Sequence, residues 1–275
     1  MKKSKPVGLL AAGRMTESPL ARVPSLARAL GPIVAVNKRL ASRYANLLRA
    51  GWASEPTGLL ACRLIVVQAK AEEWGVLSAR MGGAGCPVAI LAEEYGAALQ
   101  KRIRALGVAV CTVVISPAAR PLMVLDGDAA AVRAVRIWAS GGGVRCVELR
   151  PGGSVHYGAG IVLVSALVTP LVDAATRSLR ASGLSQVDSR QIVSRVLEGA
   201  LRSYDAHGRK GWPNPTAAGR VEAISAQCET LAARDAKLER LYARVLGACL
   251  EYYGQDTEWL DESEWATGAS NRKTK

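Results

Sequence analysis

The 275-residue chain has no phenylalanine and only two histidines, His156 and His207. Its six cysteines include no C-x-x-C pair, and most of them lie inside apolar runs. Scattered cysteines of this kind indicate small buried side chains rather than a zinc site or a disulfide framework. With so few histidines, a histidine-rich metal site is also disfavoured, and we expect no bound metal.

Long runs free of Asp, Glu, Lys, Arg and His are absent as well. In the most apolar region the run between His156 and Asp173, residues 157–172, covers 16 residues, whereas a helix needs about 20 to cross a bilayer. The basic start of the chain leads into a short strand-like run rather than into an apolar secretory segment. We therefore expect a cytoplasmic protein without a membrane span.

Acidic residues are scarce in the first part of the chain. Residues 1–49 contain ten basic residues and one acid, Glu17, and the net charge is +12 over residues 1–150 but +1 over residues 151–275. A basic half suits a phosphorylated small ligand or nucleic acid, and it can also be only a solvated surface. Because no aromatics interleave with the basic residues and no helix-turn-helix spacing stands out, we expect no nucleic-acid partner.

What is present is an alternation of strands and helices up to about residue 150. Most of the strand candidates are continuous apolar runs, as in parallel sheets buried on both faces. This order predicts an α/β fold with a Rossmann-like, doubly wound sheet in residues 1–150. The expected strands are 7–12, 33–36, 64–68, 88–91, 108–115, 122–125 and 144–149, and the expected helices are 25–29, 39–49, 72–80, 96–105 and 129–139.

Beyond Pro151-Gly152-Gly153 the pattern predicts an all-helical C-terminal domain, residues 151–254, and then a frayed tail, 255–275. The expected helices are 156–182, 187–207, 215–232 and 234–253, with a bend at Pro170 and a cap at Asp188. The first helix is apolar on all sides, so other elements must surround it. We expect a homodimer through these C-terminal helices, with burial against the chain's own sheet domain as the alternative.

Ligands of α/β sheets bind at the carboxyl ends of the strands, and the turn after the first strand is the first place to look. The three positions of a G-x-G-x-x-G fingerprint fall on Ala11, Gly13 and Thr16, so only the middle glycine is kept. Arg14 would stand beside the phosphates. We expect cofactor contacts from Ala11, Gly13, Arg14 and Met15.

The end of the second strand indicates which dinucleotide binds. NAD-specific domains carry an acid there, which repels a 2′-phosphate. This chain has Asn37-Lys38-Arg39, with Arg43 one turn later. A neutral residue followed by cations suits a 2′-phosphate, because arginine offers paired donors to its oxygens. We therefore predict NADP (NADPH) as cofactor, the alternative being that these cations are only surface.

The third expected strand, 64–68, ends at Gln68 and is followed by Ala69 and Lys70. In Rossmann domains this strand end passes under the nicotinamide ribose, so the three residues are candidates for ribose or substrate contact. The alternative is a polar strand edge followed by acids that favour a helix start.

The chain resembles the Rossmann-like bacterial proteins with domain of unknown function 2520, within the 6-phosphogluconate dehydrogenase-like superfamily that includes pyrroline-5-carboxylate reductases. The resemblance covers residues 6–254. It rests on the five segments 13–14, 37–39, 156–159, 212–215 with Gly219, and 241–242. It implies an NADP-type cofactor, a helical domain that dimerises, and a substrate cleft between the two domains.

The family's polar residues are mostly changed here: its Tyr-His pair is His156-Tyr157, in the opposite order. We expect an NADP-dependent oxidoreductase transferring hydride to or from a small carbonyl or imine, with His156, or else Tyr157, as proton donor. A histidine at a helix start can also be a cap or hinge. The alternative function is a catalytically silent nucleotide-binding or scaffold protein.

Overall fold

The computed structural model divides the chain into two compact units, residues 1–164 and 165–275. It describes residues 6–12, 18–70, 72–81, 83, 85–92, 97–116, 120–217, 220–257 and 260. Three of the expected cofactor residues, Gly13, Arg14 and Met15, lie outside these ranges, as does most of the expected tail.

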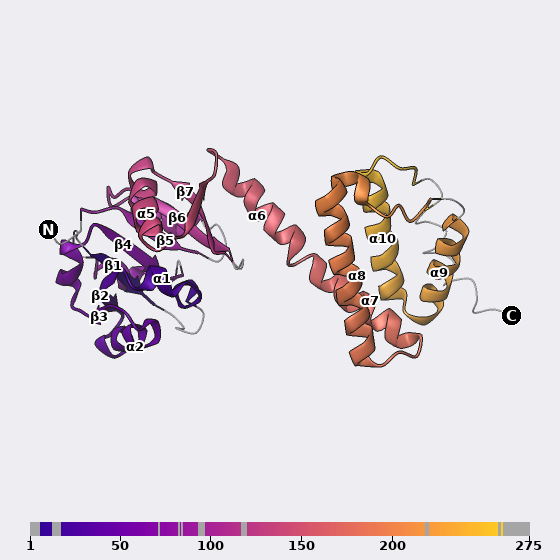
Figure 1. Cartoon of the computed structure of the whole chain (residues 1–275), viewed down its shortest axis with the longest axis horizontal. Helices are drawn as coiled ribbons and strands as arrows, with labels where there is room; N and C mark the ends of the chain where they lie inside the picture. Colours follow the sequence, from indigo (N-terminus) through magenta and orange to yellow (C-terminus); the bar gives the residue numbers. More distant parts are fainter. Residues whose placement is uncertain are drawn as a thin grey trace. The chain divides into compact units, whose positions relative to one another are not determined.

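An eight-stranded sheet forms the centre of the first unit, in the order β3-β2-β1-β4-β5-β6-β7-β8 (Figure 1). Neighbouring strands are parallel except β6 and β7, which are antiparallel. The strands are β1 (Val7–Ala11), β2 (Leu30–Ala35), β3 (Trp52–Ala53), β4 (Leu64–Gln68), β5 (Val88–Leu91), β6 (Val110–Ser116), β7 (Leu122–Gly127) and β8 (Arg145–Glu148). The predicted fold class, a Rossmann-like sheet followed by helices, is confirmed.

The sheet is buried on both faces because its strands are continuous apolar runs. Alternate side chains of a strand point to opposite faces, so that Leu9 of β1 packs into one core and Leu10 into the other. The first core includes side chains of α1 (Pro24–Ala27), α2 (Lys38–Leu48) and α5 (Ala129–Gly141). The second includes side chains of η3 (Pro56–Ala61), α3 (Trp74–Ser78) and α4 (Ala97–Arg104).

The predicted single helix over residues 156–182 is wrong, because the structure has two helices there. α6 (Gly153–Val164) ends the first unit, and α7 (Val168–Ala181) starts after a turn. Pro170 lies in the first turn of α7, where its missing N–H leaves no hydrogen bond unmade. The expected bend at Pro170 is therefore a break just before it.

The second unit consists of helices, in which α7 packs on α8 (Gln186–His207) and α9 (Arg220–Arg234) packs on α10 (Ala236–Tyr252) (Figure 1). A short η4 (Gly208–Gly211) follows α8. The cap of α8 is Ser185 rather than the predicted Asp188: the Ser185 Oγ accepts from the Asp188 N–H at 3.1 Å and donates to its carboxylate at 2.6 Å. Asp188 instead occupies the third position of a capping box.

Apolar side chains are exposed along the helices from α6 onward. Neither α6 nor α7 has a buried residue, and α8 buries only Ser189 and Val193. By length and composition alone, Gly153–Ala181 is the one candidate membrane-spanning segment among the described residues, and none of its most apolar window is buried.

Candidate functional site

Three neighbouring strands end level with one another at the carboxyl edge of the sheet. In the register of the strands, Ala11 of β1 lies opposite Ala35 of β2 on one side and Gln68 of β4 on the other. The strand order reverses at β1, with β2 and β3 on one side of it and β4 on the other, and doubly wound sheets bind nucleotides at such a switch point. The structure therefore places the predicted residues Ala11 and Gln68 opposite each other, with Asn37 two residues beyond the end of β2.

Gln68 is bonded to two separate parts of the chain at this edge. Its carbonyl oxygen accepts the Ala12 N–H at 2.9 Å, and its side-chain Oε1 accepts the Ser18 hydroxyl at 2.7 Å. Ser18 is 1% exposed and Gln68 is 9% exposed. The fully buried Tyr44 of α2 donates its hydroxyl to the Ala12 carbonyl at 3.2 Å. Both backbone groups of Ala12 are thus held in place.

The amino end of α2 presents cations next to this network. Asn37 caps the helix, with its Oδ1 accepting the Leu40 N–H at 2.8 Å. Lys38, Arg39 and Arg43 are exposed, and the first turn contains no acid. Residues four apart share a helix face, so Arg39 and Arg43 lie on the same side. Together with the positive end of the helix dipole, these side chains form a positively charged surface.

One carboxylate lies near these cations. The Glu55 Oε1 is 4.0 Å from the Lys38 Nζ, and both side chains are largely exposed. Glu55 precedes η3 and follows the short edge strand β3. Because water screens exposed ion pairs, this pair leaves Lys38 able to bind another anion.

The other two predicted residues after β4 form a turn that leads to α3. The Lys70 N–H donates to the Glu73 Oε2 at 2.8 Å, and the Lys70 carbonyl accepts the Glu73 N–H at 3.1 Å. Ala69 packs against the second core, and Lys70 is exposed. The Lys70 side chain is therefore exposed to solvent at the edge where the strands end.

His156 and Tyr157 lie in the first half of α6. His156 is exposed, whereas Tyr157 is half-buried, and burial raises the pKa of the Tyr157 phenol above its ordinary value of 10. Adjacent positions on a helix point about 100° apart, so the two side chains do not share a face. Tyr157 keeps its proton throughout the neutral pH range.

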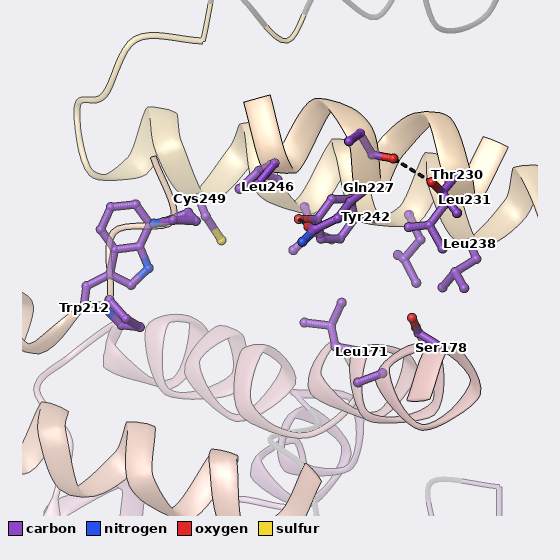
Figure 2. A pocket seen from close by; sticks show the side chains of 18 residues that line it. Leu171, Ser178, Trp212, Gln227, Thr230, Leu231, Leu238, Tyr242, Leu246 and Cys249 are labelled. Atoms are coloured by element: carbon purple, nitrogen blue, oxygen red, sulfur yellow. Dashed lines mark hydrogen bonds between the residues drawn. The ribbon is translucent and has the colours of Figure 1, made fainter. Parts of the chain in front are cut away.

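A hollow lies entirely within the helical unit. Figure 2 shows it between α7, which contributes Leu171 and Ser178, and α9 and α10, which contribute Gln227 and Tyr242. Its volume is about 810 Å³, and most of its lining is apolar. Trp212 and Cys249 lie at one end of it (Figure 2). We call this hollow the apolar slot.

Few polar groups line the apolar slot. The Tyr242 hydroxyl donates to the Gln227 Oε1 at 2.8 Å, and burial, with a contribution from Cys228, raises the pKa of Tyr242. Arg177 of α7 pairs with Asp235, which caps α10, but neither residue is part of the lining. The slot thus offers a contact surface for an apolar group, without charged side chains in its lining.

Within the described ranges, no three His, Cys, Asp or Glu side chains gather closely enough to hold a metal ion. All six cysteines are free. Burial raises the pKa of Cys62 to about 11 and that of Cys111 to about 12. These thiols are packing groups rather than nucleophiles, because the thiolate is the reactive form.

Tyr44 and Ser18 hold this edge of the sheet, but sequence patterns alone do not identify that role. Tyr44 follows Ala41 by three residues and precedes Leu48 by four, so helical spacing would have placed it on the inner face of α2. A fully buried tyrosine needs a partner for its hydroxyl. Which backbone carbonyl supplies that partner depends on the tertiary fold and has no sequence signal.

No family model matches this sequence, and no curated protein matches it significantly. Solved structures do share its fold. A Thermotoga maritima protein superposes with a TM-score of 0.65 at 11% identity, covering 90% of this chain and 99% of that one. An imine reductase from Myxococcus stipitatus in complex with NADP+ gives 0.61 at 16% identity, covering 93% and 98%. Plasmodium falciparum pyrroline carboxylate reductase with NADP bound gives 0.56 at 11% identity, covering 86% and 94%.

Proposed function

We propose that this chain is an NADP-dependent oxidoreductase that transfers a hydride to or from a small carbonyl or imine, and that it is a divergent relative of the proteins with domain of unknown function 2520. The observation that carries the proposal is the start of α2, where a neutral cap and exposed cations replace the acid that favours NAD. The shared fold with an imine reductase and a pyrroline carboxylate reductase, both bound to NADP, supports it.

The residues present fit this cofactor. Lys38, Arg39 and Arg43 would hold the 2′-phosphate through charge-assisted hydrogen bonds. Ala11 ends β1 with its methyl buried in the first core, so its main chain would face the pyrophosphate, and Arg14 would neutralise the charge of that group. Gly13 and Met15 would complete this turn. Ala69 and Lys70 would lie toward the nicotinamide ribose. The bound cofactor supplies the hydride, and these residues bind and orient it.

The substrate also needs a proton in the reductive direction. We propose that His156 donates it, with Tyr157 as the second candidate because its raised pKa keeps the phenol protonated. His156→Ala should lower the turnover without changing the affinity for NADPH, and Tyr157→Phe is the matched test of the phenol. An unchanged rate in either variant would assign that side chain a structural role only.

The deciding experiment is a titration of the protein with NADPH and NADH, followed by tryptophan fluorescence or calorimetry at two salt concentrations. We expect tight binding selective for NADPH. Replacing both Lys38 and Arg39 by alanine should weaken NADPH binding about 30- to 800-fold, since each lost charged hydrogen bond is worth roughly 1–2 kcal/mol. NADH binding should change little, and equal losses for both would contradict the 2′-phosphate assignment.

Binding and turnover separate the two functions that the sequence left open. If the protein binds NADPH and reduces members of a carbonyl and imine panel, it is the proposed enzyme. If it binds NADPH and reduces none of them, the catalytically silent nucleotide-binding protein becomes the better description.

We further propose a homodimer through the C-terminal helices. Apolar side chains of α6, α7 and α8 are exposed in the single chain, and the apolar slot is open. Exposed apolar side chains in such numbers mark an interaction site. A second copy is the occupant that we propose, because a closed pair covers the same surfaces on both partners.

A further inference from the structure

The hydrogen bonds around Gln68 join two parts of the chain that flank the end of β1. Gln68 accepts the Ala12 N–H with its main chain and the Ser18 hydroxyl with its side chain. One residue of β4 therefore fixes the distance between the residue that follows β1 and the residue that precedes η2 (Pro19–Arg22).

Both hydrogen bonds are buried, so they favour this arrangement of the chain over arrangements in which the bonds are broken. A buried hydroxyl that loses its acceptor keeps the desolvation penalty without its hydrogen bond. The Ser18 side chain therefore has a strong preference for the position opposite the Gln68 Oε1. Tyr44 adds a third bond to the same group by donating to the Ala12 carbonyl.

We infer that Gln68 is a positioning residue for nucleotide binding, acting through Ser18 and Ala12 rather than only as the ribose contact that its place at the strand end suggests. This inference rests on the proposed cofactor site. The backbone at the end of β1 binds the pyrophosphate only if it is held in the binding conformation beforehand, since any ordering left to the binding step reduces affinity.

The position of Gln68 predicts how its substitution would affect the selectivity between NADPH and NADH. The pyrophosphate is common to NADP and NAD, so a loss of positioning should weaken both nucleotides by the same factor. The cations of α2 act on the 2′-phosphate and should affect NADPH alone. Equal loss therefore separates Gln68 from Lys38 and Arg39.

The test is a double-mutant cycle of Ser18→Ala and Gln68→Leu, with NADPH and NADH dissociation constants measured by calorimetry. Each single variant should weaken both nucleotides by about three- to tenfold, and the double variant should bind no worse than the weaker single one. Ser18→Ala removes only one oxygen atom, so it keeps the cycle informative if Gln68→Leu folds poorly.

Ser189→Ala is the matched control. Ser189 is also fully buried, and its Oγ donates to the Ser185 carbonyl at 2.8 Å in the helical unit. It should change thermal stability much as Ser18→Ala does and leave both dissociation constants as in the wild type. Folded variants with wild-type affinities, or losses that add in the double variant, would overturn the role of Gln68. Wild-type protein that binds neither nucleotide would instead overturn the proposed function.

Discussion

The two units of this chain differ in how they bury their apolar residues. The first unit has two continuous cores, one on each face of its sheet, built from side chains with almost no exposure. The second has one small core around Leu246 and Leu250. A sheet covered on both faces is complete by itself, whereas helices with exposed apolar stripes need a further partner. The comparison indicates that most of the buried core lies in the first unit, and the proposed association would use the helices.

The strongest test of this contrast is a cavity in the first core. Trp138 of α5 is 0% exposed, and its Nε1 donates to the Leu26 carbonyl at 3.2 Å. Trp138→Ala should lower the free energy of unfolding by about 3–5 kcal/mol. Trp52→Ala is the control, because Trp52 is 57% exposed and its loss should change stability little. The measurement is urea unfolding, and similar losses for both variants would contradict the role of Trp138 in the first core.

The next test addresses association. Val164, the last residue of α6, is 70% exposed in the single chain. Val164→Asp would place an unpaired carboxylate in the proposed interface, so the dimer dissociation constant should rise by roughly 100-fold or more. Sedimentation analysis measures this, with Val76→Asp as the control, since Val76 is an exposed valine of α3.

A dimer that survives Val164→Asp would place the interface elsewhere. Wild-type protein that is monomeric and partitions onto lipid vesicles would favour a membrane surface as the partner of Gly153–Ala181.

A third test of the first core is the dependence of stability on alkaline pH. Burial raises the pKa of the Cys111 thiol from 9.0 to about 12. The folded state therefore resists ionisation, and stability is complete below the unfolded pKa and declines as the pH rises above it. Between pH 8 and pH 10, ionisation of this thiol in the unfolded state should lower the free energy of unfolding by about 1 kcal/mol. The free energy of unfolding, measured in urea, should decline less with rising pH for Cys111→Ala than for Cys249→Ala, which is the control substitution in the helical unit.

The smallest expected effect concerns a surface charge. Glu55→Gln removes the carboxylate that lies 4.0 Å from the Lys38 Nζ, so NADPH should bind about two- to threefold more tightly at low salt, with NADH unchanged. Glu198→Gln is the control, since Glu198 is similarly exposed and pairs with Arg202 in the second unit. An equal effect of both variants would indicate general charge rather than a local site.

The sequence pattern predicted the strands of the first unit well because a continuous apolar run needs no tertiary information. The strands at Leu64–Gln68 and Val88–Leu91 have the predicted bounds. β3, at Trp52–Ala53, is too short to give a pattern and exists only because it pairs with the edge of β2. The break before α7 was missed because the composition is equally apolar on both sides of it.

The location of the candidate site could be predicted from the sequence, but its hydrogen bonds could not. The ends of β1, β2 and β4 came from the strand order that alternating elements imply. The Ser18–Gln68 bond joins residues 50 positions apart, and nothing in either local sequence signals it. The apolar slot likewise depends on how α7 lies against α9 and α10.

One consequence of the cap at Asn37 concerns evolution rather than chemistry. The Oδ1 atom that starts α2 would be supplied equally well by aspartate, and capping strength is similar for the two residues. The same exchange would introduce the negative charge that disfavours a 2′-phosphate. Asparagine and aspartate codons differ by a single nucleotide, so one point mutation could shift the proposed cofactor preference without disturbing the helix. A lineage of such proteins could therefore pass between NADP and NAD through folded intermediates at every step.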